Sequence, residues 1–250
     1  EDLREMDQYM YMRLQDVLKT VRNAYDRYEF ASVYHTINNF VAVELSAFYL
    51  DVAKDVVYIE GVDNKDSRAM QTVMYDTLLT LLKVLTPILP HTTDELWSYL
   101  NEEELSVQLT DFPEADERSN FAELRTKWEK VIEIRDEVLK ALEEARNAKT
   151  IGKSLEAKVT VFADEAIQTL LNDSAINFAQ SCIVSQFVVG GSKESAPENA
   201  LVLEKCAIVV EHADGEKCER CWSYSTTVGQ HEKHPTACKR CADVVEKYYV

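Results

Sequence analysis

Four cysteines near the C-terminal end of the sequence form two Cys-x-x-Cys pairs. The first pair is Cys218 and Cys221, the second is Cys238 and Cys241, and sixteen residues separate the pairs. Each pair can form a tight turn that points two sulfur atoms at one centre, so that four thiolates surround a zinc ion. Because four thiolates fill every coordination position of zinc, none is left for a reactive water. We therefore predict one structural zinc ion without a catalytic role.

Two histidines and two further cysteines are weaker candidates. His231 and His234 lie between the pairs, and the sequence also allows a site with mixed cysteine and histidine ligands. We interpret both histidines as loop residues, because four thiolates already satisfy zinc. Cys182 and Cys206 lie in apolar stretches, and we expect them to be small buried hydrophobic residues. The sequence contains no serine, cysteine or carboxylate set typical of an active site.

Arg220 lies inside the first cysteine pair, and Trp222 directly follows it. By type alone, a tryptophan is as readily a core residue as a platform for a ligand, and an arginine is usually solvated. Next to a metal that holds them rigid, the two side chains would suit an unpaired nucleotide. The indole would stack on the base, and the guanidinium would bind a base edge or a phosphate. We predict that Arg220 and Trp222 contact a single-stranded RNA loop.

The composition constrains the class of protein. The formal net charge of −17 is unusual for a protein that binds nucleic acid. From residue 213 to the end, however, six acidic and six basic residues balance, so the acidic excess lies upstream. Six Gly and five Pro in 250 residues favour long helices over a turn-rich sandwich. No apolar run approaches the roughly 20 residues of a membrane span, and the start does not resemble a signal peptide. We expect a cytosolic protein without membrane contact.

The first part of the chain predicts a helical bundle, because apolar residues recur at steps of three and four. We expect helices along Leu3 to Tyr28, Phe30 to Val52 and Met70 to Ile88. Two details concern helix starts. Asp66 and Ser67 are candidate caps for the third helix. Thr92 and Glu95 are typical of a capping box that would open a fourth, short helix.

The second part of the chain changes pattern. A long connecting helix is expected to open at Ser119 or Asn120. Strands are predicted at Ala157–Phe162, Ser181–Val189 and Ala200–Val210, with a short helix at Asp164–Leu171. The expected fold is mainly α: a bundle at 1–118, a connecting helix at 119–150, a small α/β subdomain at 151–212 and a zinc ribbon at 213–250.

Several segments of the chain closely resemble the C-terminal region of bacterial isoleucyl-tRNA synthetases. They are residues 47–55 (AFYLDVAKD), 87–97 (PILPHTTDELW), 151–157 (IGKSLEA) and 218–222 (CERCW). The Pro-x-x-Pro-His break is shared with the valyl, leucyl and methionyl enzymes, whereas the third segment and the zinc tail narrow the resemblance to the isoleucine enzymes. The resemblance spans the whole chain.

This resemblance implies an antiparallel helical bundle of the class I synthetase anticodon-binding type, followed by the α/β piece and the zinc domain. It implies that the four paired cysteines hold zinc and that Arg220 and Trp222 contact the anticodon loop of tRNA for isoleucine. The ATP-handling motifs His-Ile-Gly-His and Lys-Met-Ser-Lys-Ser do not occur in this sequence. We therefore expect a monomeric, catalytically inactive part of an isoleucine–tRNA ligase, with ATP and Mg bound only by the absent catalytic domain.

Two other functions compete with this interpretation. A similar four-cysteine tail occurs in DNA glycosylases of the formamidopyrimidine type, but their catalytic N-terminus has no counterpart here. The chain could instead be an acidic helical interaction scaffold whose zinc ribbon only fixes the tail. Binding of abasic duplex DNA would favour the first alternative, and failure to bind any nucleic acid at low salt the second. We expect tRNA, and not DNA, as the partner.

Overall fold

The computed structural model describes residues 3–117 and 121–249, and the chain divides into two compact units. Unit 1 comprises residues 1–51 and 65–124, and unit 2 comprises residues 52–64 and 125–250. The short segment 52–64 therefore packs with the C-terminal half of the chain, although it lies early in the sequence. The expected start of the connecting helix at Ser119 or Asn120, and the domain limit at 118/119, lie outside the described residues.

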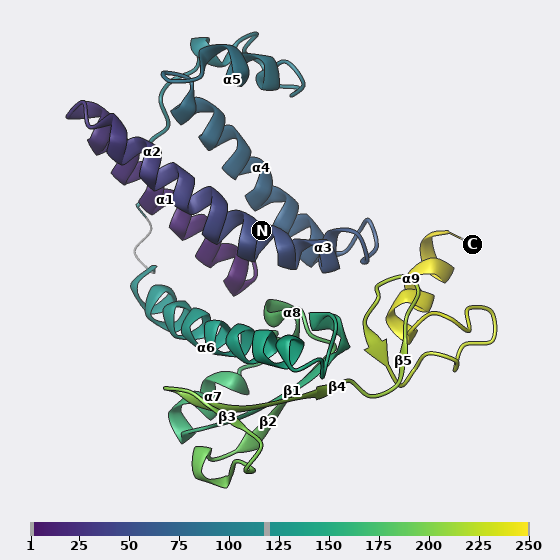
Figure 1. Ribbon diagram of the computed structural model, residues 1–250. Helices are drawn as coiled ribbons and strands as arrows, with labels where there is room; N and C mark the ends of the chain where they lie inside the picture. Colours follow the sequence, from purple (N-terminus) through teal and green to yellow (C-terminus); the bar gives the residue numbers. More distant parts are fainter. Residues whose placement is uncertain (1–2, 118–120, 250) are drawn as a thin grey trace. The chain divides into compact units, whose positions relative to one another are not determined.

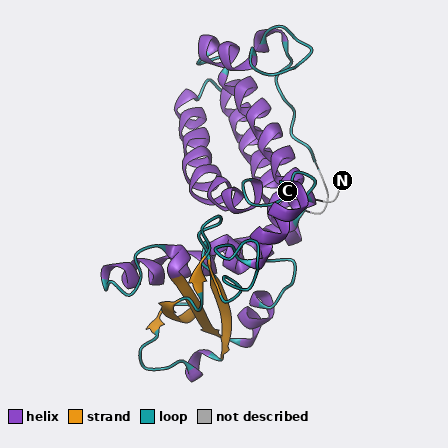
Figure 2. Cartoon of the chain, turned by 90° about the vertical axis from the view of Figure 1, so that its right-hand side faces the viewer, coloured by secondary structure: helices purple, strands orange, loops and turns teal. Residues whose placement is uncertain are grey.

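Unit 1 is built from helices that run side by side (Figures 1 and 2). The predicted apolar stripe of the first helix is confirmed, since Met10, Leu14 and Val21 are each 1% exposed or less. Tyr28, at the end of that stripe, is instead exposed beyond the end of the helix. The elements are α1 (Glu5–Asp26), α2 (Phe30–Asn39), the π-helix η1 (Phe40–Leu50), α4 (Lys65–Leu85), α5 (Pro90–Trp97) and the 3-10 turn η2 (Val107–Leu109).

The π-helix η1 changes which side chains face the core. The regular spacing predicted that Val41 would belong to the buried stripe, but its side chain is 36% exposed. A π-helix closes its hydrogen bonds over five residues instead of four, so that residues five apart align. Phe40 and Leu45 are such a pair, and both are buried. The prediction for Val41 was wrong because it assumed ordinary α-helical spacing throughout.

Both predicted helix starts in unit 1 were placed too late. Helix α4 begins at Lys65, so Asp66 and Ser67 lie within its first turn and do not precede it. Helix α5 begins at Pro90, so Thr92 is already helical and forms no capping box. A proline suits the first helical position, because its missing N–H would have had no partner there.

In unit 2, the long helix α6 (Phe121–Asn147) lies along the four-stranded sheet, whose strand order is β2-β1-β4-β3 (Figure 1). Alternate residues of β1 are buried, from Ala157 to Ala163, as in a strand with one face against a core. Strand β1 pairs parallel with β2 and antiparallel with β4. The elements are α3 (Asp51–Val57), β1 (Ala157–Ala163), α7 (Glu165–Leu171), α8 (Phe178–Cys182), β2 (Gln186–Gly191), β3 (Leu201–Val202) and β4 (Cys206–His212).

Two predicted strands differ from the structure. The stretch predicted to start at Ser181 begins with helix α8, and β2 opens only at Gln186. The stretch Ala200–Val210 is interrupted between β3 and β4, which pair with each other. The carboxylate of Glu137 on α6 accepts hydrogen bonds from the backbone N–H groups of Lys205 and Cys206, both at 2.9 Å. A distant helix thus stabilises a turn that local β propensity did not predict.

The C-terminal module of unit 2 contains a two-stranded hairpin and a helix: β5 (Glu216–Lys217), β6 (Tyr224–Ser225) and α9 (Lys239–Tyr248). Gly215 leads into the hairpin with φ of +89°, and a Cβ at this position would overlap the backbone of Ser225. The turn therefore requires glycine.

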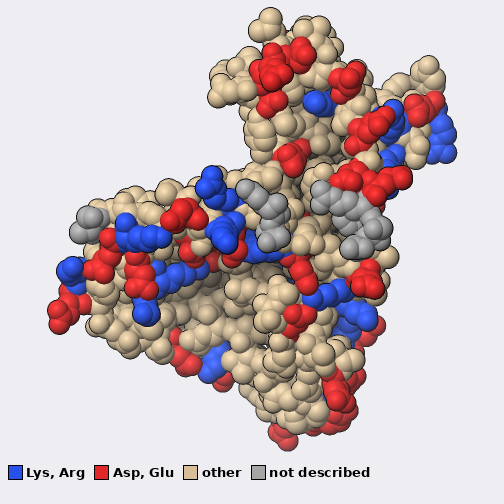
Figure 3. Space-filling model, turned by 180° about the vertical axis from the view of Figure 1, so that it is seen from behind, with Lys and Arg blue, Asp and Glu red and all other residues tan. Residues whose placement is uncertain are grey.

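Surface charge and helix length are relevant to what the chain can contact. Acidic and basic side chains are interspersed on the face of the protein shown in Figure 3. Among the described residues, no helix has the length and apolar character needed to cross a membrane.

Candidate metal centre and nucleic-acid interface

The four paired cysteines meet in one buried cluster. Their sulfur atoms all lie within 4.8 Å of one another, and Cys221 Sγ is 3.8 Å from Cys238 Sγ. Zinc bonds of about 2.3 Å to four thiolates in a tetrahedron place the sulfurs about 3.8 Å apart. The donor set and its spacing therefore fit one structural zinc ion. This is the site that the spacing of the two pairs predicted.

Backbone hydrogen bonds and one helix position the four sulfurs. In the first turn, the N–H of Trp222 donates to the carbonyl of Cys218 at 2.9 Å, and the N–H of Cys218 donates to the carbonyl of Ser223 at 2.9 Å. Cys238 is the N-cap residue of α9, and Cys241 lies in the first turn of that helix. The positive end of a helix dipole favours a thiolate, so α9 begins where it would favour the thiolates that zinc binds.

The cluster favours ionisation of one thiol before the others. The hydrogen bond from the Cys241 thiol lowers the pKa of Cys221 to about 4, although burial opposes this shift. The same hydrogen bond, together with burial, raises the pKa of Cys241. Burial also raises the pKa of Cys238. Because zinc binds thiolates, its binding would release the protons that the other thiols retain.

Trp222 is presented to solvent by the first cysteine turn. Its side chain is 59% exposed, whereas Trp97 and Trp128 are 3% and 1% exposed. Its backbone has φ of +67°, a left-handed conformation that a bulky residue rarely adopts. The ammonium group of Lys217 lies 5.7 Å from the centroid of the indole ring. An exposed aromatic ring is thus held in a strained conformation, which is typical of functional positions.

Arg220 faces the cysteine cluster and the segment 52–64. It is half-buried, and its Nη1 donates to the carbonyl of Ile59 at 2.8 Å and to Cys241 Sγ at 3.6 Å. Arg220 and Trp222 therefore share one turn but have different surroundings. The indole is open to solvent, whereas part of the guanidinium binds the protein.

The weaker candidates lie apart from the cysteine site. The rings of His231 and His234 stack on each other at 5.3 Å, and His231 Nε2 lies 3.5 Å from a carboxylate oxygen of Glu246. Among the described residues, only the four paired cysteines group closely enough to hold a metal. Cys182 and Cys206 are buried, as predicted, and burial raises their thiol pKa values to about 12 and about 11.

Sequence reasoning missed the segment that contacts the zinc module. Ile59 packs with the four paired cysteines, and the carboxylate of Asp55 binds Arg240 at 2.9 and 2.7 Å. Arg240 could have been noticed, because it occupies the same place in the second pair as Arg220 in the first. Nothing in the sequence pairs it with a carboxylate so far upstream.

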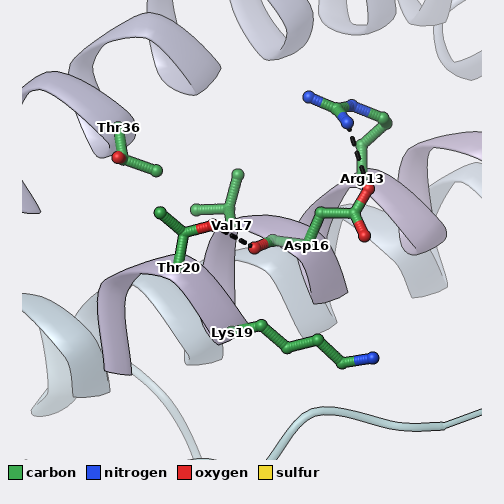
Figure 4. Close-up of a pocket in the computed structure, with 6 residues that line it drawn as sticks. All are labelled: Arg13, Asp16, Val17, Lys19, Thr20 and Thr36. Atoms are coloured by element: carbon green, nitrogen blue, oxygen red, sulfur yellow. Dashed lines mark hydrogen bonds and ion pairs between the residues drawn. The ribbon is translucent and has the colours of Figure 1, made fainter. Parts of the chain in front are cut away.

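A groove of ≈ 430 Å³ lies on unit 1, between α1 and α2. Figure 4 shows its lining, with Arg13 bound to Asp16 across one turn of α1. Arg13 also binds Glu44 at 2.6 Å, and hydrogen bonding to that carboxylate raises the pKa of the guanidinium. Lys19 lies 4.0 Å from Glu117. The cations of the groove are thus compensated by carboxylates, which weakens it as a phosphate site.

Comparison with known proteins places both parts of the chain. The model for the anticodon-binding domain of tRNA ligase matches residues 7–161, and that for a zinc finger found in FPG and IleRS matches residues 215–244. Over all 250 residues the chain is 50% identical to the isoleucine–tRNA ligases of Bacillus mycoides (strain KBAB4) and Bacillus cereus (strain 03BB102). It spans 27% of the length of each of these relatives. Because the first match covers more than half of its length, the chain belongs to the family of anticodon-binding domains of tRNA ligases.

Proposed function

We propose that this chain is the tRNA-recognition part of an isoleucine–tRNA ligase and binds the anticodon stem-loop of isoleucine tRNA. The family match and the names of the relatives support this proposal. The longer protein would ligate isoleucine to tRNA with ATP in the cytoplasm. This part would bind RNA as a monomer and perform no chemistry, since ATP and Mg would belong to the catalytic domain.

The exposed ring of Trp222 carries the proposal. Glycine would occupy the left-handed position after Cys221 without strain, whereas tryptophan there costs on the order of 1 kcal/mol or more. An indole that gains little from burial does not offset that cost in the free protein. Stacking of an unpaired base on the ring would offset it, since such stacking contributes about 1–3 kcal/mol per base.

Arg220 is the proposed second contact. A guanidinium has five N–H donors, and within the described part of the chain the hydrogen bonds of Arg220 are made through Nη1. The donors on Nε and Nη2 remain for a base edge or a phosphate next to Trp222. The balanced charge of residues 213–250 permits such a contact, whereas the acidic surface upstream would repel RNA that lacks specific contacts.

The test compares tRNA of native and swapped anticodon on the wild-type chain and on two variants. Trp222→Gly removes the ring and the strain together, so it is expected to fold and to keep zinc while losing about 5- to 150-fold in affinity for native tRNA. Trp222→Phe keeps an aromatic face and should retain most of the affinity. Swapping the anticodon should weaken wild-type binding and leave the glycine variant little changed.

Several outcomes would contradict the proposal. If the wild-type chain and both variants bound the two tRNAs with equal affinity, the anticodon would not be part of what the chain recognises. Preference for abasic duplex DNA would favour a glycosylase-type module, which the match of residues 7–161 to an anticodon-binding domain does not support. No binding to any nucleic acid at low salt would favour an interaction scaffold.

A further inference from the structure

The two cysteine turns each carry a partly buried arginine. Arg220 lies between Cys218 and Cys221, and Arg240 lies between Cys238 and Cys241. Arg220 Nη1 donates to Cys241 Sγ at 3.6 Å, which links the first turn to a cysteine of the second. Arg240 lies in the second turn and binds the carboxylate of Asp55.

The negative charge of a zinc ion with four thiolates indicates what these arginines do at the site. A zinc ion with four thiolates carries a net charge of −2, and burying such a charge is costly unless positive groups lie nearby. The guanidinium of Arg220 supplies a positive charge next to Cys241, and that of Arg240 supplies a second, which it shares with the carboxylate of Asp55. Arginine suits this role because its charge is permanent and its planar donors can bind two partners at once.

The same two arginines also bind the end of α3 and the residues that follow it. Arg220 Nη1 donates to the carbonyl of Ile59 at 2.8 Å. Arg240 binds both oxygens of Asp55, at 2.9 and 2.7 Å, and lies 3.6 Å from Glu60. Burial alone would raise the pKa of Asp55, but its bonds to Arg240 and Gln180 hold the pKa below its usual value. The ionised carboxylate is thus part of the arrangement.

The contact continues beyond the arginines. The side chain of Ile59 packs within the cysteine cluster. Gly61 lies so close to the ring of Tyr248 that a Cβ would overlap it, and the hydroxyl of Tyr248 donates to Asp63. Lys247 also binds Asp63, at 3.1 Å. Residues 55–63 thus contact both cysteine turns and the end of α9.

We propose that residues 55–63 form the outer shell of the zinc site, with Arg220 and Arg240 as positioning residues that couple zinc binding to the docking of the module. The arginines orient the thiolates and neutralise their charge, and Asp55 orients Arg240 in turn. Zinc affinity therefore depends on a carboxylate more than 160 residues upstream of the first ligand, as the positions 55 and 218 imply. This role needs no RNA and stands independently of the proposed function.

The test measures zinc affinity of the whole chain by competition with a chromogenic chelator, and the thiolate-to-metal absorption of the Co(II) form. Arg240→Gln and Asp55→Asn are expected to weaken zinc binding about 10- to 100-fold, as loss of outer-shell partners does at other metal sites. Lys239→Gln is the matched control, because Lys239 is the neighbouring cation in the same turn but pairs at the surface with Asp243, at 3.9 Å. It should bind zinc as the wild type does.

Two further measurements separate positioning from simple loss of folding. Arg240→Lys, which keeps the positive charge but not the planar pair of donors, should retain more zinc affinity than Arg240→Gln. In the wild type, zinc should slow amide hydrogen exchange at residues 58–64, and Arg240→Gln should remove this effect. Three outcomes would each overturn the proposal. The first is wild-type zinc affinity in both Arg240→Gln and Asp55→Asn, and the second is equal exchange at residues 58–64 with and without zinc. The third is an equal loss of zinc affinity in Lys239→Gln and Arg240→Gln.

Discussion

At the scale of single residues, side chains of the same type differ in their surroundings and therefore in their roles. Two of the three tryptophans fill cores, whereas Trp222 lies on the surface in a strained conformation. Two of the six cysteines are inert core residues, and four converge on one centre. In both cases the chemistry follows from surroundings, since residue type alone allows either role.

The cysteines give a prediction about thiol reactivity at pH 8. Thiolates react and thiols do not, and burial raises the pKa of Cys182 to about 12 and that of Cys206 to about 11. In the zinc-loaded chain we expect no rapid labelling by a thiol-reactive disulfide reagent. Chelation should open the cysteine turns and end the burial that raises the pKa of their thiols, so that these four react quickly, whereas the other two react only on unfolding. Rapid labelling of Cys182 in the zinc-loaded chain, identified by peptide mapping, would contradict this.

The spacing of the cysteines was sufficient to predict that their four sulfur atoms meet, because two residues between cysteines specify a tight turn. The surroundings of Arg220 could not be predicted in this way. Its bond to the carbonyl of Ile59 depends on a segment about 160 residues away in the chain, to which no spacing rule applies. The exposure of Trp222 was equally open, because burial depends on what packs against the turn.

At the scale of elements, helix α6 contributes buried charged side chains to the sheet subdomain. Arg135 Nε donates to the carbonyl of Ser181 at 2.8 Å, and Glu137 accepts from two backbone N–H groups in the turn before β4. Arg135 is 7% exposed and Glu137 is 6% exposed. A heavily charged helix is therefore more than a solvated connection between domains, because its charges fix the loops of the neighbouring sheet.

Glu137→Ala is expected to destabilise β3 and β4 by about 2–4 kcal/mol, because it leaves the buried N–H group of Cys206 and the partly buried N–H group of Lys205 without a charged acceptor. The measurement is the free energy of opening of residues 201–212, obtained from amide hydrogen exchange. Glu133→Ala is the control, since Glu133 lies one turn earlier and binds Lys205 at the surface, 3.2 Å away. That exposed pair contributes at most about 1 kcal/mol, and similar losses in both variants would refute the assignment.

Long amphipathic helices were predictable because many residues carry the same periodic signal. The limits of the elements were not, because they depend on single partners. The carboxylate of Glu137 interrupts a run of strand-forming residues before Cys206, and five-residue closure turns Val41 outward. Pro90 begins a helix that a threonine was expected to open.

At the scale of the whole molecule, the division into two units means that metal loss should have local effects. Chelation of zinc is expected to expose residues 213–249 and the contacting segment 58–64 to proteolysis, because four uncoordinated thiols cannot hold the cysteine turns together. The core of unit 1 and the sheet contain none of the ligands. Limited trypsin digestion with and without chelator, followed by mass spectrometry, measures this. Early cleavage within α1 or α4 would show that zinc stabilises both units.

The ion pair between Asp55 and Arg240 spans 185 residues and has a consequence for biosynthesis. Contacts so distant in sequence form late, because the intervening chain must first emerge and fold. On the ribosome, α1 and α2 would assemble while the stretch after α3 still lacks its partner. Zinc uptake would then be among the last steps of maturation, and a nascent chain that stalls before Cys238 would leave Ile59 exposed to chaperones and proteases.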